Sequence, residues 1–383
     1  MRVLADGRFV GLFLGRLVDH VLEAGAVRAA ILGTALVTAP LALGCSSGAP
    51  SGTAVVDGGA TEAGGSNDGG VVVPVDAGAA PPADAGTGHV VFRHPDGEWR
   101  RVAGVPASAL ENIGAALDAI ASGKDNAASL SLDGRFLALD TGRLACLRGD
   151  CLGVAGGDLK TLALISAGGT PLPPAGRPSI SAGGGRVVYP KSSPGRVDLY
   201  SVAHDGSGWA AEVPLTAASP YPYHHDVAFS WDGSKVVFDC GPSQYQDPGT
   251  CICEARTDGS SLRKVLCPED SQAGTKDNEL HHPAYAPDGT IVFEADWNSN
   301  ETVWRMNPDG SEVTKISPAA YTDDNSPCVL LDGRIASLWL GRKETDGTSK
   351  NFHELKVMNA DGSGAEMVVT GIDIVDVGLS CGL

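Results

Sequence analysis

Short apolar segments alternate with Asp-Gly pairs through the C-terminal two thirds of the chain. One pattern consists of an apolar strand, Asp-Gly and a β-branched strand, and it occurs as SLSLDGRFLALD (129–140), SISAGGGRVVYP (179–190), VAFSWDGSKVVFD (227–239), PAYAPDGTIVFE (283–294) and CVLLDGRIASLW (328–339). A second pattern interleaves with it at VDLYSVAHDGSG (197–208), CICEARTDGSS (251–261), TVWRMNPDGSE (302–312) and LKVMNADGSG (355–364). The spacing indicates an internal repeat of about 50 residues.

The residues of each repeat favour paired strands. Asp-Gly tolerates the positive φ of a two-residue hairpin turn, and the β-branched and aromatic residues beside it suit a half-buried sheet. Two hairpins per repeat make one four-stranded sheet, which buries both faces only when such sheets stack around an axis. The pattern therefore predicts an all-β fold, a β-propeller.

The two ends of this region complement one another. Residues 89–102 read as the second hairpin of a repeat, and residues 374–382 read as a lone first strand. We therefore expect six blades, the last built from both chain ends and closing the ring.

One segment breaks the strand pattern. Ser108 and Glu111 have capping-box spacing, and the apolar positions that follow share one helical stripe: Leu110, Ile113, Leu117 and Ile120. This predicts a helix lying across one end of the ring.

The N-terminal part reads as an export signal. Residues 29–43 carry no charge and are too few to span a bilayer, but they suit the apolar core of a signal peptide. Ala42-Leu43-Gly44-Cys45 follows and resembles the lipobox of bacterial lipoproteins, which implies that Cys45 is acylated and becomes the new N-terminus. An ordinary secretory signal next to an unrelated cysteine is the alternative. Acidic residues interrupt residues 1–27, so we expect translation to start near Val27.

The chain after Cys45 predicts a tether. Residues 45–88 consist mainly of Gly, Ala, Ser, Pro and Asp, which offer too little apolar surface to offset the entropy of ordering. The expected organisation is a signal peptide (1–44), a lipidated cysteine with a disordered linker (45–88) and a propeller (89–383). Ser46 lacks the Asp that retains lipoproteins in the inner membrane of enteric bacteria, so an outer-membrane lipoprotein is expected, on either face of that membrane.

The net charge of −18 makes nucleic acid an unfavourable partner, because a negative surface repels phosphate backbones. Acidity that only maintains solubility is the simpler reading. Membrane attachment is expected through the lipid alone, and the protein is expected to be a monomer.

Eight cysteines follow Cys45, and an even number in an exported chain predicts up to four disulfides: Cys146, Cys151, Cys240, Cys251, Cys253, Cys267, Cys328 and Cys381. Cys146 should pair with Cys151 across a short hairpin. Within one repeat we expect Cys240–Cys251 and Cys253–Cys267. Cys328 and Cys381 fall on the innermost strands of neighbouring blades. Zinc binding at Cys251-Ile-Cys253 is less favoured, because C-x-C alone is a weak metal signal.

The segments PAYAPDGTIVF and VAFSWDGSKVVF, followed by MNPDGS and MNADGS, resemble the TolB-type, WD-repeat-like β-propeller repeat. The resemblance covers residues 88–383 and implies the fold, but says little of function. The namesake of the family has an additional α/β domain before its propeller, where this chain has an anchor and a linker. The Tol–Pal role is therefore not carried over.

No nucleophile elbow, phosphate-binding loop or metalloprotease motif is present, so no enzyme is predicted. Two histidine pairs are the candidate chemistry: His224-His225 lies seven to eight residues before Asp232, and His281-His282 lies six to seven before Asp288. His225 and His281 therefore hold equivalent positions at the mouth of the channel.

In the next repeat, Asn325 holds the position equivalent to His225 and His281, with Asp323 and Asp324 beside it. Imidazoles and carboxylates that meet on an axis could bind a divalent metal or an acidic sugar. This arrangement loosely resembles oligogalacturonate lyases, propellers with axial metal-binding histidines, but no full ligand set or base can be matched. The alternative is a repeat consensus that fills the channel mouth through hydrogen bonds.

These observations favour a lipid-anchored envelope binding module for a protein, peptide or glycan, without a cofactor. A metal-dependent enzyme acting on acidic polysaccharide is one alternative. A structural envelope spacer is the other.

Overall fold

The computed structural model describes residues 88–144, 146, 149–243, 248–271, 278–297, 301–317, 323–345 and 348–383. The signal peptide, Cys45 and the linker predicted above lie outside these residues, except for Gly88. Among the described residues, no helix is long and apolar enough to cross a membrane.

Almost every described element is a strand, and the strands form four-stranded units. The chain ends share one sheet, in the order β26 (Val375–Gly382), β1 (His89–Arg93), β2 (Trp99–Ala103) and β3 (Glu111–Asn112). The next sheet contains β4 (Asp125–Leu130), β5 (Phe136–Thr141), β6 (Cys151–Gly156) and β7 (Leu162–Leu164). A small two-stranded sheet of β8 (Ser166–Ala167) and β9 (Thr170–Pro171) follows.

The middle of the chain forms an eight-stranded sheet from two such units, joined by one parallel pair between Val197 and Tyr223. The first unit holds β10 (Ser179–Ile180), β11 (Arg186–Ser193), β12 (Arg196–Ala203) and β13 (Val213–Pro214). The second holds β14 (Tyr223–Phe229), β15 (Lys235–Gly241), β16 (Cys251–Arg256) and β17 (Arg263–Leu266), and the 3-10 turn η1 (Pro268–Asp270) follows it.

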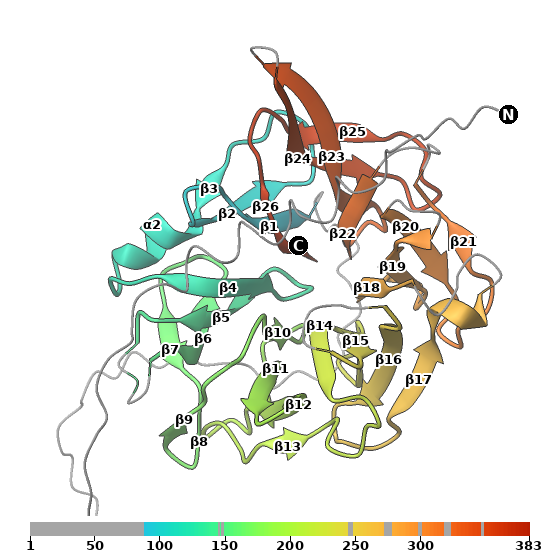
Figure 1. Ribbon diagram of the computed structural model, residues 1–383. Coiled ribbons are helices and arrows are strands. Elements are labelled where there is room, and N and C mark those ends of the chain that lie inside the picture. Colours follow the sequence, from blue (N-terminus) through green and yellow to red (C-terminus); the bar gives the residue numbers. More distant parts are fainter. Residues whose placement is uncertain are drawn as a thin grey trace, which may run out of the picture. The chain divides into compact units, whose positions relative to one another are not determined.

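Two further four-stranded sheets complete the described chain. One contains β18 (Leu280–Tyr285), β19 (Ile291–Ala295), β20 (Thr302–Met306) and β21 (Thr314–Lys315). The other contains β22 (Asp323–Val329), β23 (Ile335–Thr345), β24 (Thr348–Met358) and β25 (Glu366–Val369). All these units, here called blades, surround a common centre toward which their first strands lie (Figure 1). The all-β propeller fold expected from the sequence is confirmed.

The core lies between successive blades. Phe92 of the β26–β3 blade packs with Leu338 and Leu355 of the β22–β25 blade, and Leu199 of β12 packs with Phe238 of β15. Each blade thus covers a face that its neighbour would otherwise expose, as the repeat spacing implied.

The Asp-Gly turns are longer than the two-residue hairpins expected. The glycine adopts positive φ (67° at Gly233, 85° at Gly289), and its N–H donates to the carbonyl three residues earlier. The preceding Asp carboxylate accepts the N–H two residues ahead, as Asp232 does from Ser234 at 3.0 Å. The aspartate therefore stabilises the turn through its side chain, and the glycine supplies the left-handed conformation.

The helix lies four residues later than the capping box predicted. α2 (Ile113–Asp118) begins after Asn112, whose side chain caps Ala115 N–H, while the Ser108 hydroxyl donates to the Val105 carbonyl. Ile113 and Leu117 are buried, but Leu110 and Ile120 are 38% and 42% exposed. Glu111 belongs to β3, and strand pairing overrides the capping signal there.

Four disulfides join the eight cysteines. Cys146 pairs with Cys151, and Cys328 of β22 pairs with Cys381 of β26. The two pairs expected within one repeat are wrong: the structure joins Cys240 to Cys253 and Cys251 to Cys267. Ile252 pairs with Leu266 across β16 and β17, which brings Cys251 beside Cys267 and leaves Cys253 to Cys240.

Candidate functional site

The innermost strands share an irregularity where the histidines lie. β14, β18 and β22 each shift register after His225, His281 and Asn325, which hold the same position in their strands. The next residue adopts positive φ in each strand: 46° at Asp226, 49° at His282 and 50° at Ser326. This bulge turns the side chains of that residue toward neighbouring blades.

His282 belongs to a chain of charged groups around the axis. Its Nε2 lies 3.4 Å from Asp226 Oδ2 on β14, and its Nδ1 lies 3.1 Å from Glu294 Oε2 on β19. Arg177 Nη2 lies 3.4 Å from the other oxygen of Asp226. Glu294 also accepts the Ser326 N–H at 2.7 Å. The groups therefore link four successive blades.

These neighbours set the protonation of His282 and Asp226. Burial disfavours the charged imidazole, but Asp226 and Glu294 outweigh it and raise the pKa of His282 to about 9. Burial also opposes the ionised Asp226, yet His282 and Arg177 lower its pKa to about 2. At neutral pH both groups are charged, and the chain alternates in sign.

His281 and His225 meet at one carboxylate. Asp239 accepts the His225 backbone N–H at 2.9 Å, and its other oxygen lies 3.1 Å from His281 Nδ1. His281 Nε2 lies 3.2 Å from Glu279. Burial opposes protonation of His281, but Asp239 and Glu279 raise its pKa well above the usual value. His281 is therefore a buried cation between two carboxylates.

His224 has a packing role. It is fully buried, its Nδ1 lies 2.8 Å from the Val197 carbonyl, and its ring meets Phe238 edge-on. Burial lowers its pKa, so it is neutral.

The acidic residues of β22 are also engaged in contacts. Asp324 is buried and pairs with Lys356 of β24. The Asn325 side chain donates to Asp376 at 2.9 Å, which ties β22 to β26. Asp323 is half-buried, and burial together with Asp324 raises its pKa.

The histidines and acids predicted from the sequence do not converge on one point. The rings of His224, His281 and His282 lie against different carbonyl or carboxylate groups, whereas His225 meets Asp239 through its backbone N–H. No group of three or more His, Cys, Asp or Glu within the described part of the chain could hold a metal ion. The arrangement supports hydrogen bonding and ion pairing between blades.

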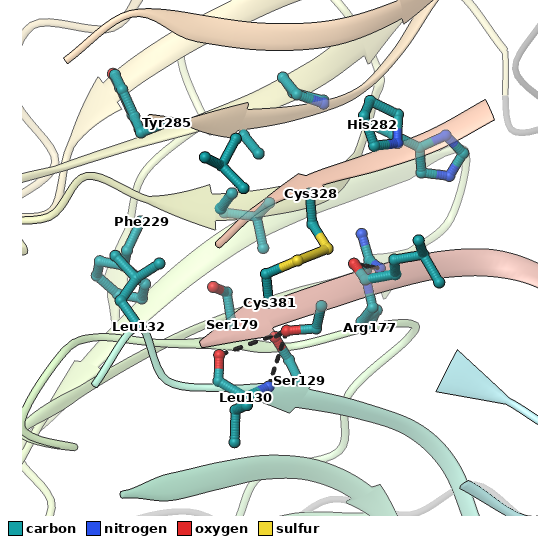
Figure 2. A pocket seen from close by; sticks show the side chains of 18 of the residues that line it. Ser129, Leu130, Leu132, Arg177, Ser179, Phe229, His282, Tyr285, Cys328 and Cys381 are labelled. Atoms are coloured by element: carbon teal, nitrogen blue, oxygen red, sulfur yellow. Dashed lines mark hydrogen bonds between the residues drawn. A yellow bond between two sulfur atoms is a disulfide. The ribbon is translucent and has the colours of Figure 1, made fainter. Parts of the chain in front are cut away.

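Side chains largely fill the axis itself. A cavity of about 50 Å³ lies between the innermost strands, which leaves room for a few water molecules. Arg177 and His282 lie at one end of it, and Leu132, Phe229 and Tyr285 lie at the other (Figure 2). The Cys328–Cys381 disulfide and a hydrogen bond from Leu130 N–H to Ser380 Oγ form part of its wall (Figure 2).

A larger recess, of about 440 Å³, opens at the end where Arg177 lies; we call it the mouth recess. It is lined by residues of the β26–β3, β4–β7, β10–β13 and β14–β17 blades: Trp99, Asn126, Ala127, Asp140, Gly176, Arg177, Pro190, His225, Asp226 and Val377. This volume falls in the usual range for small-molecule sites. Of the seven predicted axial residues, only His225 lines it.

Two residues that line the mouth recess each carry a buried polar atom without a partner within the described residues. Asp140 is 7% exposed, and its Oδ1 has no hydrogen-bond donor. His225 Nε2 is buried and has none either. Burial, with contributions from Asp150 and Asp125, raises the pKa of Asp140 to about 7 against the effect of a hydrogen bond from Asn126, which lowers it. Unpartnered buried polar atoms carry a free-energy cost, which a bound ligand with complementary groups would remove.

The sequence contained signals for residues that the prediction missed. Asp140, Asp239 and Glu294 each lie one or two residues before the end of the second strand of a repeat, after FLAL, VVF and IVF. Arg177 precedes a proline just as His282 does, and this proline lies directly before β10 in one case and within β18 in the other. Aligning the repeats by these positions would have placed an acid and a polar residue at the axis of several blades.

No protein-family model and no curated protein sequence matches the chain. Among solved structures, it is similar to part of hydrazine synthase from Kuenenia stuttgartiensis, with a TM-score of 0.50 and 13% identity over 77% of this chain and 46% of that one. It is also similar to a putative TolB from Agrobacterium tumefaciens (TM-score 0.48, 17% identity, covering 77% of this chain and 96% of that one). A nidogen/laminin complex gives a TM-score of 0.49 at 8% identity, over 77% of this chain and 98% of that one. At these identities the likeness concerns the fold alone, and no sequence family is shown.

Proposed function

We propose that this chain is a binding module of the bacterial cell envelope, anchored by a lipid on Cys45, which holds its ligand in the mouth recess. The observation that carries the proposal is that Asp140 and His225, which line a recess of about 440 Å³, each carry a buried polar atom without a partner, Oδ1 and Nε2. His282 is ion-paired through both ring nitrogens. His224 Nε2, His281 Nε2 and Asn325 Oδ1 are also buried without a hydrogen bond, but these residues do not line the recess. Asp140 and His225 are the residues that combine an unpartnered atom with a place in its lining.

An exported location agrees with the cysteines. Four disulfides form and persist in oxidising compartments, such as the periplasm or the cell surface. The uncharged segment 29–43, followed by Ala42-Leu43-Gly44-Cys45, supports lipid anchoring. The linker of residues 45–88 would then hold the propeller at a distance from the membrane, with the outer membrane as the proposed site.

The experiment is a thermal-shift screen of the purified full-length chain. Its panel contains amino sugars, neutral and acidic oligosaccharides, and short peptides, since a compound that binds only the folded state raises the melting temperature. Val377 lines the recess and is 37% exposed, so the indole of a Val377→Trp variant should fill the recess. We expect at least one compound to stabilise the wild type but not this variant.

Ile120→Trp is the matched control. Ile120 is 42% exposed and lies outside the recess, so this variant should respond as the wild type does. If every stabilising compound acts equally on Val377→Trp, the ligand lies elsewhere. If none stabilises the wild type, the binding function is wrong for these classes of ligand.

A further inference from the structure

From the contacts of Asp140 we infer that the mouth recess selects a ligand bearing a primary ammonium group, with Asp140 as its counter-ion. This inference rests on the proposed function and names the class of ligand that the site would take. An amino sugar, a lysine side chain and an aliphatic diamine share this chemistry.

The first argument is the unmatched carboxyl oxygen. The Asp140 residue is more than nine-tenths buried and lines the recess, and its Oδ1 receives no donor among the described residues. An ammonium group offers three N–H donors and no acceptor, so it can satisfy this oxygen and compensate the charge together. A ligand carboxylate would instead be repelled.

The second argument is the local charge. Asp150 and Asp125 act electrostatically on Asp140. Arg143 pairs with Asp125 and with Asp118. Asn126 donates to Asp150 at 2.7 Å. Arg143 is thus paired with two carboxylates, although its Nη2 has no hydrogen-bond partner. The four carboxyl groups outnumber this one guanidinium, so the region attracts cations.

The far wall does not reverse this preference. Arg177 lies there, but Asp226 pairs with it, and its Nη1 donates to the Leu379 carbonyl at 2.7 Å. His225 adds an imidazole nitrogen that can accept a hydrogen bond when neutral. A second polar group of the ligand can therefore meet His225 while the ammonium meets Asp140.

The walls limit what can follow the ammonium group. The indole N–H of Trp99 is used by the Asp125 carbonyl, at 3.1 Å, so its ring contributes apolar atoms to the recess. Pro190, Ala127 and Val377 are also apolar. This combination suits an ammonium on a carbon chain or a sugar ring, where apolar atoms contact the walls.

The test is calorimetric titration of the full-length chain with three amines: glucosamine, Nα-acetyl-lysine amide and putrescine. Glucose is the neutral control. We expect at least one amine to bind in a 1:1 ratio, and the amine that binds identifies the source of the ammonium. Asp140→Asn should weaken its binding at least tenfold. Asp361→Asn, which changes an exposed turn carboxylate in another blade, should leave binding unchanged.

The pH dependence supplies a second readout. The charged groups that act on Asp140 are Asp150 and Asp125, and Arg143 pairs with Asp125. Arg177, Asp226 and His225 line the recess with Asp140. With a pKa of about 7 for Asp140, its ionised fraction falls about tenfold from pH 8 to pH 6. Putrescine, if it binds, should lose affinity by a similar factor, because its ammonium groups stay charged over this range.

Three outcomes would overturn the inference: no amine binds, glucose binds as tightly as the amines, or Asp140→Asn binds them unchanged. If Asp140→Asn does not fold, Val377→Trp takes its place, and amine binding that survives this blocking substitution overturns the inference. A neutral compound that binds the wild type but not Val377→Trp would leave the proposed binding function intact and refute only the ammonium class.

Discussion

His282 shows how one side chain can join the blades. It leaves β18 at a positive φ of 49° and reaches Asp226 on one neighbouring strand and Glu294 on another. The repeat spacing placed His225 and His281 in equivalent positions, and the structure does so too. Spacing could not indicate which atoms each ring meets, because that depends on the bulge and on carboxylates contributed by other strands.

At this scale we predict a pH-dependent contribution to stability. An unfolded histidine has a pKa near 6.5, whereas that of His282 is raised to about 9 in the fold. The stabilisation is therefore fully present below about pH 6.5 and is lost as the pH rises toward 9. His282→Gln should lower the free energy of unfolding at pH 6.5 by about 1–3 kcal/mol and reduce the loss between pH 6.5 and 9.5.

Urea unfolding of the wild type and His282→Gln at both pH values measures this effect. His281, whose pKa is also raised, remains in both proteins, so only the difference between them reports on His282. Equal losses of stability in the two proteins would show that His282 does not titrate as described.

At the scale of elements, the four cysteines around β15 and β16 illustrate a limit of sequence reasoning. Cys240 and Cys251 lie directly opposite one another across the two strands, as expected, yet each bonds elsewhere. Residues 251 and 253 face the same side of β16, so either cysteine could reach Cys240. The disulfide pairing is decided by β17, which brings Cys267 beside Cys251. Likewise, the helix was predicted, but its start depended on the pairing of β3.

The Cys328–Cys381 disulfide is the covalent link between β22 and β26. It closes a loop of 53 residues, and a cross-link of this kind stabilises the fold by about 2–4 kcal/mol. Replacing both cysteines with Ala should lower the free energy of unfolding by that amount. The Cys146–Cys151 disulfide spans only five residues and provides the comparison. Replacing both of its cysteines with Ala should lower the free energy of unfolding by less. Equal losses would contradict the loop-length argument.

At the scale of the molecule, the fold was the most predictable feature. The Asp-Gly repeat predicted paired strands, and their number predicted stacked sheets, because a single four-stranded sheet cannot bury both faces. The candidate site was much less predictable. His225 was anticipated, whereas the mouth recess arises where four blades meet and has no signature within any one of them.

Deleting residues 372–383 removes β26, the strand that pairs with β1 and packs against β22. Buried Leu379 and Cys381 leave the core with it. We expect loss of most of the stability and of a cooperative melting transition, measured by calorimetry. A truncated chain that melts as sharply as the parent, at a similar temperature, would show that β26 does not close the fold.

Anchoring can be tested through Cys45. Under the proposed anchoring the lipid is attached to this thiol, so Cys45→Ala should abolish lipidation and the protein should leave the membrane fraction. Fractionation and detergent partitioning of labelled cells measure this. Ser46→Ala, at the adjacent position, is the control and should remain with the membrane. If Cys45→Ala still partitions into detergent, the anchor lies elsewhere.

The pairing of β26 with β1 also bears on the timing of biosynthesis. His89 lies opposite Gly382, so two strands that pair directly are separated by nearly all of the described chain. A chain made from its N-terminus must therefore keep β1 without its inner neighbour until β26 has been synthesised. Until then the inner edge of β1 is open to other strands or to proteases.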